Sequence, residues 1–159
     1  NHGSRPAQVA VHSQSTSPTP YLLEPNGRTA VRVPLEPECA YKVAIHGPAG
    51  FLRVFADART ATPLEVRVAI VQTSSRPNLE WTISNTGDEP VQVRVTDALA
   101  PQTEAFEVPV GTTCGGSPAP LDAANGWYDL AFHVADAPTF ERRYVGHLED
   151  GEPSTTRPL

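Results

Sequence analysis

The sequence predicts an all-β protein: an antiparallel β-sandwich of the immunoglobulin-like type, with two related lobes in tandem and the first lobe incomplete. Seventeen prolines in 159 residues exclude long helices, because proline breaks a helix interior. Apolar and polar residues alternate through short segments such as 64–71 and 91–95, which is the period of a strand with one face in a core. A third observation is that one hairpin pattern occurs twice in the chain.

Turn residues separate the alternating segments, and many short strands at this spacing are typical of a sandwich. Trp81 lies in the middle of one segment and is expected to be a core anchor. Residues 13–20 are expected to form a polar loop, and residues 58–63 a connector between the lobes. In chain order, we expect strands at 7–12, 20–24, 29–35, 40–46, 51–56, 64–71, 79–85, 91–97, 104–109, 126–134 and 140–148.

The repeated pattern is a hairpin with the frame Tyr-x-aliphatic-Ala-apolar-His, a turn, and Phe-x-Arg-x-aromatic. It covers residues 41–55 in the first instance and residues 128–144 in the second. We therefore expect two related sandwiches, with residues 1–60 as a partial first repeat and residues 61–159 as a complete second repeat.

The first repeat has no counterpart of the strands expected at 64–71 and 79–85. The chain also starts at Asn1 and contains no Met, so we expect a piece of a longer protein that begins inside the first repeat. A lobe without two strands leaves an open edge, and we expect a partner surface to cover it.

Composition argues against several classes of partner. The formal net charge is −6, and Lys42 is the single lysine among the 12 Lys and Arg residues. A net-negative domain gains nothing from phosphate electrostatics, so no nucleic-acid partner is expected. No run approaches the ~18 apolar residues of a membrane-spanning helix.

Catalytic motifs are missing from the sequence. There is no Gly-x-Ser-x-Gly elbow, no Gly-x-Gly-x-x-Gly and no Walker loop. His46 and His133 share one repeat position on the polar side of their strands, and with His12 and His147 they show no metal-ligand spacing. We therefore expect no catalytic residue, no metal ligand and no cofactor in this chain.

Two cysteines and one acidic residue leave alternatives open. Cys39 and Cys114 either form a disulfide, if the compartment is oxidising, or remain two separate thiols without a neighbouring base. Asp129 is expected to pair with Arg142 or with Arg143 across the last hairpin.

Trp127 and Tyr128 are the candidate ligand- or membrane-contact residues. They follow the Asn125-Gly126 turn, so they are either core residues or an exposed platform at a loop tip. An exposed aromatic platform is how sandwich modules contact sugars or lipid headgroups.

The end of the chain carries a specific pattern. Asn-Gly-Trp-Tyr-Asp-Leu at 125–130, Phe-x-Arg-Arg at 140–143 and Gly-His-x-Glu-x-Gly-x-Pro-Ser at 146–154 resemble the end of bacterial phosphocholine-specific phospholipase C. The segment 47–53 and the opening strand 64–68 are similar too, and the resemblance covers nearly all of residues 6–158.

The resemblance implies a place in a larger enzyme. That family carries this domain twice in tandem after a metal-dependent catalytic domain of the alkaline-phosphatase-like superfamily. The catalytic domain cleaves phosphatidylcholine or sphingomyelin, and some members are acid phosphatases. No catalytic or metal residue of the family maps onto this sequence, and the family implies an exported bacterial protein, either secreted or periplasmic.

The function expected from the resemblance is a non-catalytic C-terminal accessory domain of a secreted phospholipase C. It would brace the upstream catalytic domain of the same chain or aid engagement of a phospholipid surface. The alternative is a stand-alone β-sandwich that binds a lipid headgroup or carbohydrate. A small hydrolase would need histidines beside a carboxylate in a cleft. The substrate preference of the parent and the oligomeric state stay open.

Overall fold

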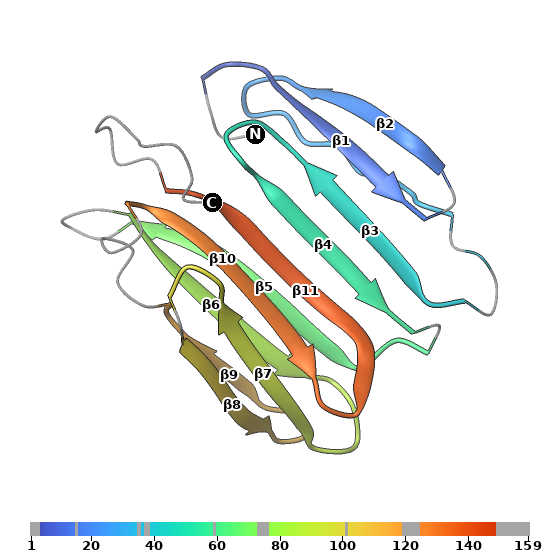
Figure 1. Cartoon of the computed structure of the whole chain (residues 1–159), viewed down its shortest axis with the longest axis vertical. Helices are drawn as coiled ribbons and strands as arrows, with labels where there is room; N and C mark the ends of the chain where they lie inside the picture. The colour runs from blue at the N-terminus through green and yellow to red at the C-terminus, as the bar shows by residue number, and fades with distance from the viewer. Residues whose placement is uncertain are drawn as a thin grey trace.

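The structure is a computed structural model of the chain, and it describes residues 4–14, 16–34, 36, 39–58, 60–72, 77–100, 102–118 and 125–148. Every regular element in these ranges is a β-strand, which confirms the all-β fold class (Figure 1). The strands are β1 (Ala7–Ser13), β2 (Thr16–Leu23), β3 (Tyr41–His46), β4 (Leu52–Asp57), β5 (Leu64–Gln72), β6 (Pro77–Asn85), β7 (Val91–Asp97), β8 (Gln102–Val108), β9 (Thr113–Gly116), β10 (Trp127–Val134) and β11 (Ala137–His147).

The strands form two antiparallel sheets. The long sheet has eight strands in the order β2-β1-β3-β4-β11-β10-β7-β8, and the short sheet has three in the order β5-β6-β9. In Figure 1 the short sheet overlaps the part of the long sheet built from β11, β10, β7 and β8. The two layers form an open sandwich that is closed over only one half of the long sheet.

The hydrophobic core lies between the two layers. Trp81, as expected, is a buried anchor: its ring meets Phe132 edge-on at 5.8 Å and stacks on Phe106 at 5.7 Å. Alternation on each strand supplies the rest of the core, because every second side chain faces the opposing sheet. The buried members of this cluster are Leu64, Leu79, Trp81, Ile83, Val93, Val95, Val108, Tyr128, Leu130, Phe132, Val134, Phe140, Tyr144 and Leu148.

Two expected elements differ from the structure. The segment expected as a polar loop at 13–20 is mostly strand, because β2 begins at Thr16. Its prolines are tolerated, since β2 is at the edge of the long sheet, where a missing N–H breaks no ladder. The strand expected at 29–35 is irregular over its described residues 29–34, although burial still alternates there.

One strand was not expected at all. β9 has the sequence Thr-Cys-Gly-Gly, without apolar alternation, yet it pairs with β6. Gly116 explains the pairing, because a Cβ at this position would lie 2.6 Å from Cζ2 of Trp81. Only a residue without a side chain lets the backbone approach the core tryptophan this closely.

The connector at 58–63 is organised by a buried carboxylate. Asp57 is fully buried and accepts hydrogen bonds from the backbone N–H of Ala58 at 2.8 Å and of Thr62 at 2.9 Å. The Thr62 hydroxyl donates a third bond, at 2.9 Å. The turn from β4 into β5 is therefore tied by one side chain.

Candidate functional site

The polar side chains that the fold brings together lie where β4 meets β11. These strands pair antiparallel from Leu52↔Val145 to Ala56↔Glu141, and they join the strands before residue 58 to those after it in one sheet. An arginine from each strand reaches across this junction. We call Arg53, Arg142 and their tyrosine partners the arginine junction.

The Arg53 guanidinium makes three hydrogen bonds and stacks on an aromatic ring at the junction. Its Nη1 donates to the carbonyls of Leu52 at 2.8 Å and Val145 at 2.7 Å, and its Nη2 donates to the Tyr128 hydroxyl at 2.9 Å. The guanidinium also lies 4.2 Å from the centre of the Phe51 ring. Hydrogen bonds from a charged donor to several acceptors are among the stronger ones in proteins.

Arg142 makes the same set of contacts from the other strand. Its Nη1 donates to the carbonyls of Glu141 at 3.1 Å and Ala56 at 2.5 Å, and its Nη2 donates to the Tyr41 hydroxyl at 3.3 Å. The guanidinium lies 4.4 Å from the centre of the Phe140 ring. Arg142 has one additional partner, the Asp57 carboxylate at 3.6 Å.

The two sets of contacts are related by an approximate two-fold axis. In the ladder, Arg53 is opposite Tyr144 and Arg142 is opposite Phe55, so each arginine faces an aromatic residue of the other strand. The pair Val54↔Arg143 lies at the centre. The repeated Phe-x-Arg-x-aromatic frame is the sequence signal that could have indicated this junction, although sequence reasoning did not assign a role to the arginines.

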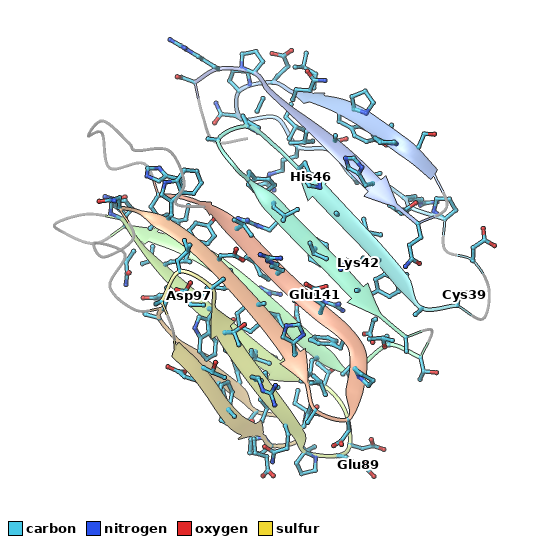
Figure 2. The ribbon with its side chains drawn as sticks, viewed as in Figure 1. Cys39, Lys42, His46, Glu89, Asp97 and Glu141 are labelled. Carbon is cyan, nitrogen blue, oxygen red and sulfur yellow. The ribbon has the colours of Figure 1, made fainter. Side chains whose placement is uncertain are left out.

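The outer face of the long sheet carries a second, forked ion pair. Arg143 donates from Nε to Oδ1 of Asp129 at 2.7 Å and from Nη2 to Oδ2 at 2.8 Å, which decides between the two expected partners of Asp129. The hydrogen bond to Asp129 raises the pKa of Arg143 despite its partial burial. Farther along, Lys42 of β3 reaches over β4 to Glu141 of β11 at 2.8 Å (Figure 2).

One tyrosine links the sheets beside the junction. The Tyr144 hydroxyl donates to the carbonyl of Val66 on β5 at 3.0 Å. Burial raises the pKa of Tyr144, and the nearby positive charges of Arg53 and Arg142 oppose that shift.

Of the four histidines that the structure describes, only His12 and His46 contact each other. The rings of His12 and His46 touch at 4.8 Å, and neither these two nor His133 pairs with a carboxylate of the described residues. His147 packs on the Trp127 ring at 4.9 Å and lies 2.9 Å from the carbonyl of Asn125 through Nε2. Within the described ranges, no group of three His, Cys, Asp or Glu residues could hold a metal ion.

A hollow of about 530 Å³ lies at the end of β10. Apolar residues, among them Pro138 and Phe140, form much of its lining, and Gln92, Arg94 and His133 supply polar atoms. Arg94 and His133 are opposite each other in the ladder between β7 and β10. Neither makes a side-chain hydrogen bond or ion pair with any other residue that the structure describes.

Trp127 and Tyr128 are core residues, the first of the two alternatives. They are 7% and 2% exposed, so neither ring forms an exposed platform. Trp127 packs against the turn at Gly50, and the hydroxyl of Tyr128 is the acceptor for Arg53. A ligand contact at these two residues stays a prediction, and it would require the rings to leave these positions.

Both cysteines are free thiols in the structure, which favours the second alternative for this pair. Cys39 is exposed in the segment before β3 (Figure 2). Cys114 on β9 packs against the core cluster. Among the described residues there is also no helix long and apolar enough to cross a membrane.

Known proteins resemble this chain along most of its length. A family model described as "Bacterial phospholipase C, C-terminal domain" matches residues 1–56 and 59–147. A "Non-hemolytic phospholipase C" of Pseudomonas aeruginosa is 33% identical over 127 residues, which is 74% of this chain and 18% of that protein. A "Hemolytic phospholipase C" of the same organism is 31% identical over 143 residues, 87% of this chain and 18% of that protein.

A third relative comes from another organism. A "Non-hemolytic phospholipase C" of Burkholderia pseudomallei is 30% identical over 125 residues, 75% of this chain and 17% of that protein. The chain therefore spans less than a fifth of the length of each of these relatives.

Proposed function

This chain belongs to the family of bacterial phospholipase C C-terminal domains, and from that premise we propose that it is a non-catalytic accessory region that braces an upstream catalytic domain. The parent would hydrolyse phosphodiesters of the phosphatidylcholine or sphingomyelin type and would be exported from the cell. The relatives' printed names and the small share of each that this chain covers support the proposal.

The observation that carries the bracing role is the arginine junction. Arg53 and Arg142 donate to carbonyls of the strand opposite and to phenols one strand beyond it, on β10 and β3, and these contacts hold the long sheet together across the β4–β11 pair. A continuous eight-stranded sheet is a stiff support, because β4 and β11 cannot separate without breaking these partly buried bonds.

Catalysis is tested on the chain itself. We expect the 159-residue chain to release no nitrophenol from p-nitrophenyl phosphorylcholine, with or without added divalent metal ions. Metal-dependent turnover that survives removal of trace enzyme by a second chromatographic step would refute the non-catalytic role.

Bracing is tested in the parent enzyme. The substitution Arg142→Gln should shorten the half-life of activity at elevated temperature and leave kcat at low temperature unchanged, because the chemistry lies in another domain. Arg67→Gln is the matched control, since Arg67 is exposed and, among the described residues, its side chain pairs with Glu65 alone. Equal half-lives for the two variants would argue against bracing.

The hollow supports the second candidate, engagement of a lipid headgroup or a carbohydrate. Arg94 and His133 offer donors to a phosphate or hydroxyl group, and the apolar lining can hold a chain or a sugar face. In a sedimentation assay, the wild-type chain should pellet with vesicles of phosphatidylcholine, and the Arg94→Gln/His133→Gln variant should stay in the supernatant. If both stay in the supernatant, the accessory region acts by bracing alone.

A further inference from the structure

His12 of β1 and His46 of β3 form a pair on the outer face of the long sheet. Their strands are antiparallel neighbours, and in the ladder His12 is opposite Ala44. His46 is opposite Ala10, so the two histidines are diagonal neighbours and each lies across from an alanine. The short alanine side chains leave room for the rings to meet over the ladder, with centres 4.8 Å apart and 67° between the ring planes. Figure 2 shows His46 at the end of β3.

The ring nitrogens of this pair have no hydrogen-bond partner in the part of the chain that the structure describes. Neither His12 nor His46 makes a side-chain hydrogen bond or an ion pair there, and their contact is with each other's ring. By contrast, Nε2 of His147 lies 2.9 Å from the carbonyl of Asn125. Imidazole is the commonest protein ligand of metal ions, so two adjacent rings with their nitrogens available are candidate ligands for one ion.

The separation of the rings matches that of two imidazoles on one ion. With a Zn–N bond of about 2.0–2.1 Å, the centre of a bound imidazole ring lies about 3.2 Å from the metal. Two such rings at ligand angles between about 90° and the tetrahedral value of about 109° have centres about 4.5 to 5.2 Å apart. The 4.8 Å found between the rings of His12 and His46 lies inside this range.

The ladder positions next to the pair carry no positive charge. Besides the two alanines, the residue opposite His46 on β4 is Leu52. Lys42 shares this face of β3 by strand alternation, but its ammonium group lies 2.8 Å from the Glu141 carboxylate. A hollow of about 380 Å³ borders His46, and its lining among the described residues contains no charged side chain. A hydrated dication can therefore reach the pair, and the net charge of −6 favours its approach.

We propose that His12 and His46 together bind one zinc ion, which fastens the β1–β2 hairpin to the rest of the long sheet. In the order of the sheet, the hairpin is joined to β3 by the β1–β3 ladder, whose four pairs run from Ala10↔His46 to Ser13↔Val43. Both ligands lie within these four pairs, so the ion adds a bridge at the point of attachment. Water fills the other positions of the ion, since the described residues contain no group of three metal-binding side chains. This site departs from the sequence expectation of no metal ligand.

Zinc titration of the 159-residue chain tests the proposal. The chain is made without an affinity tag in a Cys39→Ser/Cys114→Ser background, so that no thiol competes for the ion. Calorimetry at about pH 7.5 should show one bound Zn²⁺, and in NMR spectra the imidazole signals of His12 and His46 should shift while that of His133 stays in place. Saturating Zn²⁺ should also slow amide hydrogen exchange in residues 9–13 of β1 by about tenfold or more, because the ion holds β1 against β3.

Removal of either ligand should weaken the site. His12→Gln and His46→Gln should each raise the Kd for Zn²⁺ by about tenfold or more, because a single imidazole lacks the effective concentration of a second one. His133→Gln is the matched control on another strand of the long sheet, and His2→Gln controls for a histidine outside the described residues. A wild-type Kd above about 1 mM, unchanged affinity in His12→Gln/His46→Gln, or loss of binding in either control would overturn the proposal. Zinc binding by both histidines without slower exchange in β1 would refute the fastening of the hairpin.

Discussion

Arg53 and Tyr128 are 75 residues apart in the chain, and Nη2 of the arginine donates to the tyrosine hydroxyl at 2.9 Å. Arg142 and Tyr41, separated by 101 residues, make the equivalent bond in the opposite direction. Each arginine thus belongs to one hairpin and is bound by the other. The long sheet is held together at its centre by side chains as well as by the β4–β11 ladder.

Replacing Arg53 with Gln should weaken this junction. The variant loses donors to the carbonyl of Val145 and to the hydroxyl of Tyr128, and we expect the free energy of unfolding to fall by about 2 kcal/mol. Urea denaturation followed by circular dichroism measures it. Arg67→Gln, which removes an exposed pair, should change stability by less than about 0.5 kcal/mol. Equal effects of the two substitutions would contradict a structural role for Arg53.

The forked pair of Arg143 and Asp129 should show strong coupling. Asp129 is 1% exposed, so Arg143→Gln leaves a buried carboxylate without its charged partner. Because the side chain of Arg143 is 36% exposed and partly screened by water, we expect a cost of about 2 kcal/mol, below that of a fully buried pair.

A double-mutant cycle isolates this interaction. The variant Arg143→Gln/Asp129→Asn should be more stable than Arg143→Gln alone, because a neutral amide is cheaper to bury than a carboxylate that has lost the charge of Arg143. Additive costs in urea denaturation would show that the two side chains do not stabilise each other.

Gly50 should tolerate no side chain. It has φ of +70°, and a Cβ there would lie 2.7 Å from Cζ3 of Trp127, so Gly50→Ala combines backbone strain with a steric clash. We expect a loss of about 2 to 3 kcal/mol and a change in tryptophan emission.

Gly111 is the matched control for Gly50. Its φ is +67°, yet a Cβ there would have nothing within 4 Å, so Gly111→Ala should cost only about 1 kcal/mol and leave the emission unchanged. Identical losses for the two variants would mean that the contact with Trp127 contributes nothing.

Tyr144 should make stability depend on pH in the alkaline range. Burial raises the pKa of its phenol above the ordinary value of 10.0, so the folded protein keeps the proton at pH values where the unfolded chain releases it. This contribution is complete below about pH 10 and is lost as the pH rises through the folded-state pKa.

Tyr144→Phe tests that dependence. At neutral pH the variant should be about 1 kcal/mol less stable, because the carbonyl of Val66 loses its donor. Above about pH 10 the gap to the wild type should narrow, since only the wild type must keep this phenol protonated to stay folded. Urea denaturation at a series of pH values measures the gap, and a gap that stays constant would show that the phenol is not perturbed.

Ten of the eleven segments that the sequence periodicity predicted as strands are strands in the structure. The periodicity failed where a segment has alternating burial without strand pairing, or strand pairing without alternating burial. Residues 30–34 keep an alternation of exposure, with Val31 and Val33 half-buried and Arg32 exposed, yet they form no ladder. β9 forms a ladder without alternation, because Gly116 fits beside Trp81. An alternating pattern reports which side of a segment is buried and says nothing about which backbone lies next to it.

The aromatic residues show the same limit. Trp127 and Tyr128 could be assigned to a strand after a turn, but their burial depends on the turn at Gly50 and on Arg53, which come from a distant part of the chain. Asp129 had two candidate partners on the next strand, Arg142 and Arg143. Its partner is Arg143, because the two side chains lie on the same side of the sheet. Arg142 points to the other side and serves the junction.

By itself, the sequence determined the all-β class, most strand positions, the repeated hairpin frame and the resemblance to the phospholipase C family, because short-range alternation, prolines and turns are local properties of the chain. Only the tertiary structure decided that β4 pairs with β11, that two arginines bind across that pair, and that one half of the long sheet is covered while the other is open. These relationships join residues far apart in the chain. They depend on which strand edges still lack hydrogen-bond partners, and which apolar faces are still exposed, after each hairpin has formed.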